Sequence, residues 1–170
     1  FVSFGTDGGG SVRIPSSLCG AVGIKQTHGR VSLRGALPPF GSSDHIAPVT
    51  RSVRDSALVL QVVAGYDDLD PTSVPVPVPD YLAELEKNVK GLTMGIPTNH
   101  YFDRLDPEVE AAVQKAIGVL QELGIKTKPV TINYLQYGGA GANGEGLVFH
   151  EKWLRTRLKD YTSTASYRML

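Results

Sequence analysis

GTDGGGSVRIP, residues 5–15, is the most informative stretch of the chain. The glycines Gly8 to Gly10 carry no Cβ, so the backbone N–H groups of such a loop can converge on one point. Ser11 follows directly, at the start of a helix predicted over about residues 11–19. A hydroxyl beside converging backbone donors is what acyl transfer requires, a nucleophile next to an oxyanion hole. An ordinary flexible turn is the alternative interpretation of the same glycines.

Other uses of a glycine loop fail on their residue patterns. A phosphate-binding G-x-x-x-x-G-K-[ST] loop needs a Lys before the hydroxyl residue, where Gly10 stands. A dinucleotide fingerprint, G-x-G-x-x-G, fails because Arg13 stands at its last glycine. The serine elbow G-x-S-x-G fails at the same residue. None of the four histidines is adjacent to Ser11 in sequence, so a His base for its hydroxyl cannot be named.

Flanking segments predict short strands and one capped helix. Strands are expected over residues 1–4 and 21–25, on either side of the glycine loop. Ser52 with Asp55 resembles a capping box, and Gly65 ends the helix that follows. Residues 57–64 are apolar almost all round, so we expect this helix to be buried on most sides.

The second half of the chain predicts a βαβ unit after a Pro-rich connector. Residues 67–80 contain a run of alternating Val and Pro, a pattern typical of extended backbone that joins other elements. A strand over 92–96, a helix begun by Asp106 and Pro107, and a strand over 125–130 then follow. Strand, helix and strand in this order predict parallel pairing, and a further helix is expected over about 143–158. The fold class is therefore α/β.

Composition excludes several classes of protein. With 170 residues, of which 41% are hydrophobic and 20% charged, the chain is expected to form one packed domain and not a disordered segment. The 17 basic and 17 acidic side chains cancel, so no net field favours direct binding of nucleic acid. The longest apolar stretch, residues 57–64, is far shorter than the roughly 18 to 20 residues that span a bilayer.

Cysteine and histidine usage predicts a cytoplasmic protein without a metal or other cofactor. The single cysteine, Cys19, cannot form an internal disulfide and has no ligand spacing around it, which favours a reducing compartment. We expect it to pack in the core. The histidines show no paired spacing and are expected to be structural or surface groups; they are His28, His45, His100 and His150.

The sequence closely resembles the amidase signature family. The resemblance is carried by residues 5–15, then by Cys19-Gly20, Gly23-Ile24-Lys25, Thr27 and Gly29-Arg30-Val31-Ser32. It continues through residues 50–57, Ala64-Gly65 and residues 70–73, and more loosely through the helix that follows Asp106. Gln26 and Ala47-Pro48-Val49 depart from the family pattern at scaffold positions. The resemblance implies a mixed sheet covered by helices.

The family also implies a Ser-cis-Ser-Lys triad that cleaves amide C–N bonds through an acyl-enzyme. Its nucleophile falls on Ser11, and its oxyanion hole on the N–H groups of Gly8, Gly9 and Gly10. Asp7 and Arg13 match positions that hold the loop in shape. A neutral Lys acting through the bridging Ser removes the need for His. The family's Lys and cis-Ser lie upstream in motifs that this sequence does not contain, and Lys25 is not that base.

Three functional interpretations stay open. The first is a hydrolase of a small carboxamide, with a homodimer as a possible assembly. The second is the glutaminase component of a tRNA-dependent amidotransferase, which takes ammonia from glutamine and works with partner subunits. The third is a noncatalytic piece: the sequence begins inside a predicted strand and ends without a stop signal, so we expect residues 1–170 to be an internal fragment of one amidase signature domain, inactive alone.

Overall fold

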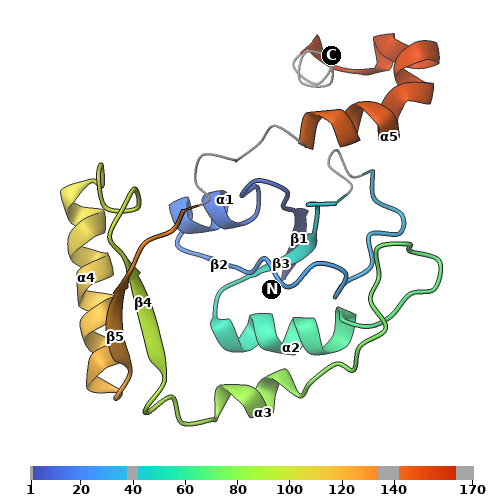
Figure 1. Ribbon diagram of the computed structural model, residues 1–170. Helices are drawn as coiled ribbons and strands as arrows, with labels where there is room; N and C mark the ends of the chain where they lie inside the picture. The colour runs from blue at the N-terminus through green and yellow to red at the C-terminus, as the bar shows by residue number, and fades with distance from the viewer. Residues whose placement is uncertain (1, 38–41, 134–141, 164–170) are drawn as a thin grey trace. The chain divides into compact units, whose positions relative to one another are not determined.

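The computed structural model describes residues 2–37, 42–133 and 142–163 (Figure 1). The chain divides into two compact units, one comprising Phe1–Glu86 with Gly139–Leu170 and the other Lys87–Gly138. Both contain helices and strands, as the predicted α/β class requires.

A three-stranded antiparallel sheet organises the first unit. Its order is β1 (Ser3–Thr6), β3 (Ile46–Thr50), β2 (Val22–Gly23), with β3 in the centre. Ser3 pairs with Val49 and Thr6 with Ile46, while Val22 pairs with Thr50 on the other side of β3. The central strand was not predicted, because Ala47-Pro48 interrupts a strand pattern in the sequence. Ala47 and Pro48 are nevertheless both buried.

Helices α1 (Arg13–Leu18) and α2 (Val53–Val63) directly follow strands of this sheet in the sequence. Helix α1 is shorter than the predicted 11–19, and Cys19, its C-cap, is exposed. The expectation that Cys19 packs in the core is wrong, because the short helix ends there and its side chain faces solvent. Helix α2 begins as predicted, with the Ser52 hydroxyl accepting from the Asp55 N–H at 3.1 Å.

The expected burial of α2 on most sides is wrong for this chain. Ser56, Ala57 and Leu60 are buried, but Leu58 is 51% and Val62 78% exposed. One face of α2 packs against β3 and against α3 (Tyr81–Leu85), and the other is open. Asp80 caps α3 by accepting from the Ala83 N–H at 2.9 Å, and residues 67–79 run without helix or strand.

The second unit is the predicted βαβ unit. Strands β4 (Thr93–Pro97) and β5 (Lys126–Val130) pair in parallel, with Thr93 opposite Lys126, and α4 (Pro107–Glu122) connects them. Asp106 caps α4 by accepting from the Glu108 N–H at 2.9 Å, as its place before Pro107 predicted. Gly124 ends the helix with φ +89°, a conformation that favours glycine.

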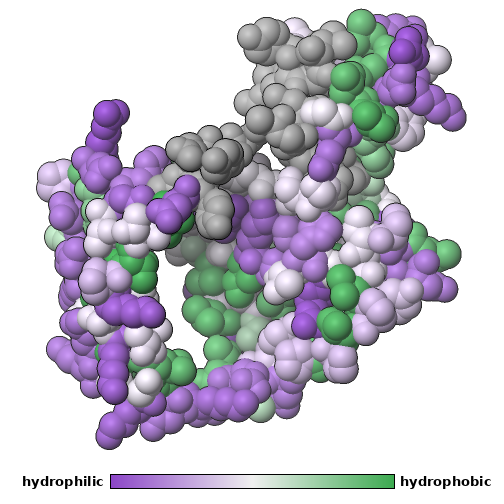
Figure 2. All heavy atoms as spheres, viewed as in Figure 1, coloured by the Kyte–Doolittle hydropathy of each residue, from purple (hydrophilic) through white to green (hydrophobic). Residues whose placement is uncertain are grey.

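Helix α5 (Ala142–Arg157), which belongs to the first unit, is followed by the one-turn 3₁₀ helix η2 (Leu158–Asp160). Leu154 is buried, whereas Leu147 and Leu158, predicted on the same side, remain 41% and 48% exposed. Figure 2 shows apolar side chains at the surface of this helix. The helix predicted over about residues 143–158 is thus present, with its start at Ala142.

Candidate active site

The glycine loop connects β1 to α1, and it is built around one buried carboxylate. Strand β1 ends at Thr6 and α1 begins at Arg13, so residues 7–12 form the whole connection. The side chain of Asp7, the first of them, is completely buried. A buried charge is tolerated only with close partners, so its contacts determine the shape of the loop.

Backbone N–H groups from the far end of the loop donate to this carboxylate. Gly10 N donates to Asp7 Oδ1 at 2.8 Å, and the N–H groups of Val12 and Arg13 donate to Oδ2 at 3.2 Å each. The chain therefore curls back over Asp7 immediately before and after Ser11. Val12 is 1% exposed and anchors the turn in the core.

The guanidinium of Arg13 completes the shell around Asp7. Its Nε lies 3.0 Å from Oδ2 and its Nη2 3.0 Å from Oδ1, a two-point contact that matches the planar carboxylate. Hydrogen bonds from the Arg13 side chain, followed by those from the Arg13 and Val12 N–H groups, outweigh desolvation and hold the pKa of Asp7 well below its usual range. The carboxylate is therefore ionised at every physiological pH.

Lys25 approaches the opposite end of the loop. Its ammonium donates to the carbonyl oxygen of Gly8 and lies 3.7 Å from Asp7 Oδ1. Its side chain is 20% exposed, so the contact is partly shielded from water. Sequence reasoning excluded Lys25 as the family's base but gave it no other role, since this contact joins residues that are 17 positions apart.

The base of the loop is tied to the segment that precedes β3. Asp7 N donates to the carbonyl oxygen of His45 at 2.9 Å, and the buried His45 ring contacts the Ser43 carbonyl through Nδ1 at 2.8 Å. Burial is the main cause that lowers the pKa of His45. The ring of His28 meets that of His45 edge-on, with centroids 5.2 Å apart. His45 therefore holds the start of the loop through its backbone carbonyl, and His28 packs against the His45 ring.

The three glycines of the loop are not equivalent, because the N–H of one of them is already engaged. The N–H of Gly10 donates to Asp7, so in this arrangement it is not free to stabilise an oxyanion, contrary to the expectation that all three N–H groups serve this purpose. Within the described residues, the N–H groups of Gly8, Gly9 and Ser11 have no protein acceptor. These three are the available donors.

Ser11 lies at the outer surface of the loop. Its side chain is exposed, and it stands between Gly10 and Val12, both held by Asp7. The carbonyl oxygen of Gly10 accepts from the Ile14 N–H at 2.8 Å, which begins the helical turn directly after the serine. The structure therefore brings Asp7, Gly10, Ser11 and Arg13 together and leaves the hydroxyl accessible.

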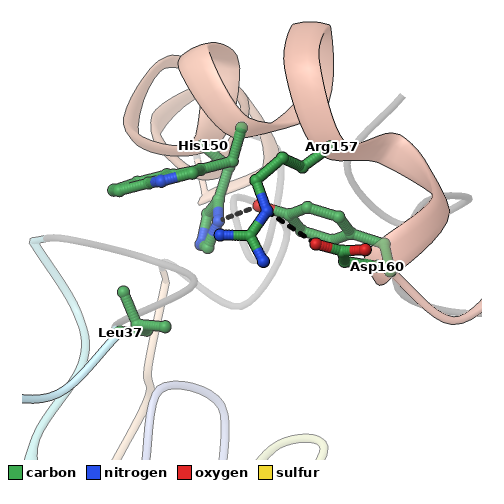
Figure 3. A pocket seen from close by; sticks show the side chains of 6 residues that line it. Leu37, His150, Arg157 and Asp160 are labelled. Carbon is green, nitrogen blue, oxygen red and sulfur yellow. Dashed lines mark hydrogen bonds and ion pairs between the residues drawn. The ribbon is translucent and has the colours of Figure 1, made fainter.

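A separate pocket lies beside α5 and was not predicted. Its volume is about 340 Å³, and its walls are Leu37, His150, Trp153, Arg157, Asp160 and Tyr161 (Figure 3). His150 is 6% exposed, and its Nδ1 lies 2.8 Å from the Tyr161 hydroxyl. Residue spacing along α5 does not reveal this pocket, because Tyr161 comes from beyond the helix.

Two further observations concern cofactors and membranes. Among residues 2–37, 42–133 and 142–163, no cluster of three or more His, Cys, Asp or Glu side chains could hold a metal ion. Among the helices described, none combines the length and the apolar character needed to cross a bilayer.

Comparisons with known proteins show that this chain is similar to amidases. The family model described as Amidase matches residues 1–164. An amidase of Pseudomonas putida is 53% identical over 133 residues, which are 78% of this chain and 28% of that protein. The A-type subunit of glutamyl-tRNA(Gln) amidotransferase from Trichlorobacter lovleyi is 48% identical over 138 residues, 81% of this chain and again 28% of the relative. The chain thus spans little more than a quarter of either relative.

Solved structures show the same fold. One concerns a vestigial protein complex and the evolutionary origins of an s-triazine catabolic enzyme; it matches with a TM-score of 0.85 at 32% identity. The match covers 99% of this chain and 37% of that one.

Proposed function

This chain belongs to the amidase family, and from that premise we propose that it forms part of a longer enzyme that hydrolyses a carboxamide with Ser11 as nucleophile. The observation that carries the proposal is the position of Ser11. It is exposed between Gly10 and Val12, whose N–H groups the buried Asp7 carboxylate holds, and next to free backbone N–H groups.

The proposed reaction uses this geometry. Ser11 Oγ attacks the amide carbon, and the negative charge that develops on the carbonyl oxygen is stabilised by the N–H groups of Gly8 and Gly9. The C–N bond then breaks, the amine leaves with a proton, and water hydrolyses the Ser11 ester to release the acid. No cofactor enters these steps.

The base that receives the Ser11 proton is not assigned within this chain. Lys25 is engaged with Gly8 and Asp7. We propose that a Lys and a bridging Ser from elsewhere in the longer protein serve as the base, as the resemblance implies. The noncatalytic interpretation then applies to residues 1–170 alone, which would lack hydrolytic activity.

Asp7 and Arg13 are proposed to hold the loop and not to touch the substrate. The carboxylate is completely buried and saturated by backbone and guanidinium donors, so it has no free oxygen for a substrate. Its function is to keep Ser11 and the N–H groups at fixed positions, which lowers the reorganisation that the reaction requires.

The experiment uses the longer protein that carries these residues. Ser11→Ala should lower amide hydrolysis by at least about 10³-fold, as loss of a nucleophile does. Ser17→Ala is the matched control, because Ser17 is an exposed serine of α1 that only donates to the Ile14 carbonyl. Hydrolysis that persists in the Ser11→Ala variant would contradict the proposal.

A second candidate function is supported by the 48% identity to a component of glutamyl-tRNA(Gln) amidotransferase. The same chemistry would then release ammonia from glutamine within an assembly of several chains. The two functions differ in substrate and partner. An amidotransferase component should release ammonia from glutamine and co-purify with its partner chains, whereas a hydrolytic amidase should act on simple carboxamides by itself.

A further inference from the structure

We infer that Lys25 is a positioning residue that orients the amide hydrogen of Gly9 toward the reacting carbonyl oxygen. The inference rests on the proposed function, since it concerns the same loop. It assigns to Lys25 a role in catalysis that involves neither substrate contact nor proton transfer.

Lys25 holds a part of the loop to which the Asp7 carboxylate makes no hydrogen bond. The Asp7 carboxylate fixes the N–H groups of Gly10, Val12 and Arg13, all on one side of the turn. The peptide between Gly8 and Gly9 donates no hydrogen bond to that carboxylate. Its carbonyl oxygen accepts instead from the Lys25 ammonium.

The direction of one end of a peptide bond determines the direction of the other. In a planar trans peptide the C=O of one residue and the N–H of the next point to opposite sides. Because the Gly8 carbonyl points to Lys25, the Gly9 N–H points away from it. Space is open around Gly9, since a Cβ built there meets nothing within 4 Å.

The hydrogen bond from Lys25 is the contact that fixes the orientation of the Gly8–Gly9 peptide in the part of the chain that the structure describes. Glycines on both sides tolerate conformations that other residues avoid, so without this bond the Gly8–Gly9 peptide can rotate at small cost. Rotation would turn the Gly8 carbonyl oxygen outward and the Gly9 N–H inward. A carbonyl dipole would then face the developing negative charge, and stabilisation of the transition state would be lost.

The role of Lys25 can be tested with a fluorophosphonate, which needs no knowledge of the substrate. The reagent is applied to the longer protein that carries this chain. Ser11 Oγ forms a bond to phosphorus, the P–F bond breaks, fluoride leaves, and the serine proton passes to the base. The phosphoryl oxygen occupies the oxyanion position, so the maximal rate of inactivation, kinact, reports on the donors. The concentration for half-maximal rate, KI, reports on reagent binding.

Lys25→Met should lower kinact by about 10- to 100-fold while KI changes little, because removal of an oxyanion donor costs up to about 10²–10³ in rate. Lys25→Arg should restore most of the rate, since a guanidinium can also donate to the Gly8 carbonyl. Lys115→Met, on the exposed surface of α4, is the matched control and should react like the unchanged protein.

An unchanged kinact in Lys25→Met would overturn the inference. So would a loss of rate that Lys25→Arg does not restore, or one accompanied by an equally large rise in KI and a lower unfolding temperature, which marks a general structural role. Should Lys25→Met not fold, Lys25→Gln replaces it under the same criteria. If the unchanged protein is never labelled at Ser11, the proposed function itself fails, a result distinct from those above.

Discussion

Arg13 and Asp7 meet through two parallel hydrogen bonds of 3.0 Å each, although Arg13 is half-exposed and Asp7 is completely buried. The pair closes the loop that carries Ser11, since the two residues lie on either side of it in the chain. A charge that is fully desolvated depends on each of its partners, so the loop should respond strongly to changes at this carboxylate.

Asp7→Asn tests the role of this charge. The variant keeps the shape of the side chain but weakens its hydrogen bonds to Gly10, Val12 and Arg13, and we expect the free energy of unfolding to fall by about 3 kcal/mol. Urea unfolding of both proteins at neutral pH measures this difference. Asp68→Asn, at an exposed position, is the control. Equal stability of Asp7→Asn and the parent would contradict the account.

The same pair predicts a pH dependence. The Asp7 pKa is lowered in the folded state, so below the ordinary value of about 4 the unfolded chain binds a proton that the folded chain does not. The contribution of Asp7 is therefore fully present above about pH 5 and is lost as the pH falls. The stability difference between the parent and Asp7→Asn should be constant from about pH 5 to 8 and shrink below about pH 4. A difference that grows in acid would contradict the assignment.

Gly10 and Gly9 should differ in their tolerance of a side chain. Gly10 has φ +133°, and a Cβ there would lie 2.7 Å from Ile14 Cδ1, whereas Gly9 has open space and no positive φ. Gly10→Ala should lower the free energy of unfolding by about 1–3 kcal/mol, and Gly9→Ala should leave it nearly unchanged. Thermal unfolding of the two variants decides this, and equal loss in both would show that the loop conformation is not the one described.

The Asp106 cap gives a prediction for the second unit. Asp106→Ala removes the acceptor for the Glu108 N–H and should lower the free energy of unfolding by about 1 kcal/mol. Asp106→Asn keeps a side-chain acceptor at the N-cap and should therefore retain most of the stability of the parent protein. Denaturant unfolding of the three proteins checks the order. A larger loss in Asp106→Asn than in Asp106→Ala is the contradictory outcome.

Tyr161→Phe tests the pocket beside α5. His150 is buried, its Nδ1 bonds to the Tyr161 hydroxyl, and its Nε2 has no partner among the described residues. Loss of the hydroxyl leaves the imidazole unsatisfied and should lower the free energy of unfolding by about 1–3 kcal/mol. Tyr66→Phe, at an exposed tyrosine, is the control and should have little effect. Equal unfolding midpoints for both variants would contradict the hydrogen bond.

Local signals in the sequence predicted the parts of the fold that local chemistry determines. The caps at Ser52 and Asp106 are read from residue types, and both are present. The strand β3 was missed because its pairing depends on β1 and β2, which lie more than twenty residues away, and because Pro48 opposes a strand pattern. Helix α3 was missed since the Val-Pro run before it obscures the Asp80 cap.

The residues of the candidate site also fall into those that local sequence predicts and those that only the folded chain reveals. Ser11 and the glycines are recognised from contiguous sequence, and so are the matching positions of Asp7 and Arg13. The different hydrogen bonding of Gly10 depends on where one buried carboxylate points, which the sequence does not specify. The contact of Lys25 with Gly8 and the support from His45 join distant segments.

The central claim is that Ser11 is the nucleophile of an amide hydrolase, and mapping a covalent adduct tests it most directly. The longer protein is incubated with a fluorophosphonate and digested, and the modified residue is identified by mass spectrometry. We expect one modified serine, Ser11, and no modification in the Ser11→Ala variant. A stable adduct on any other residue of this chain, with Ser11 unmodified, would contradict the claim.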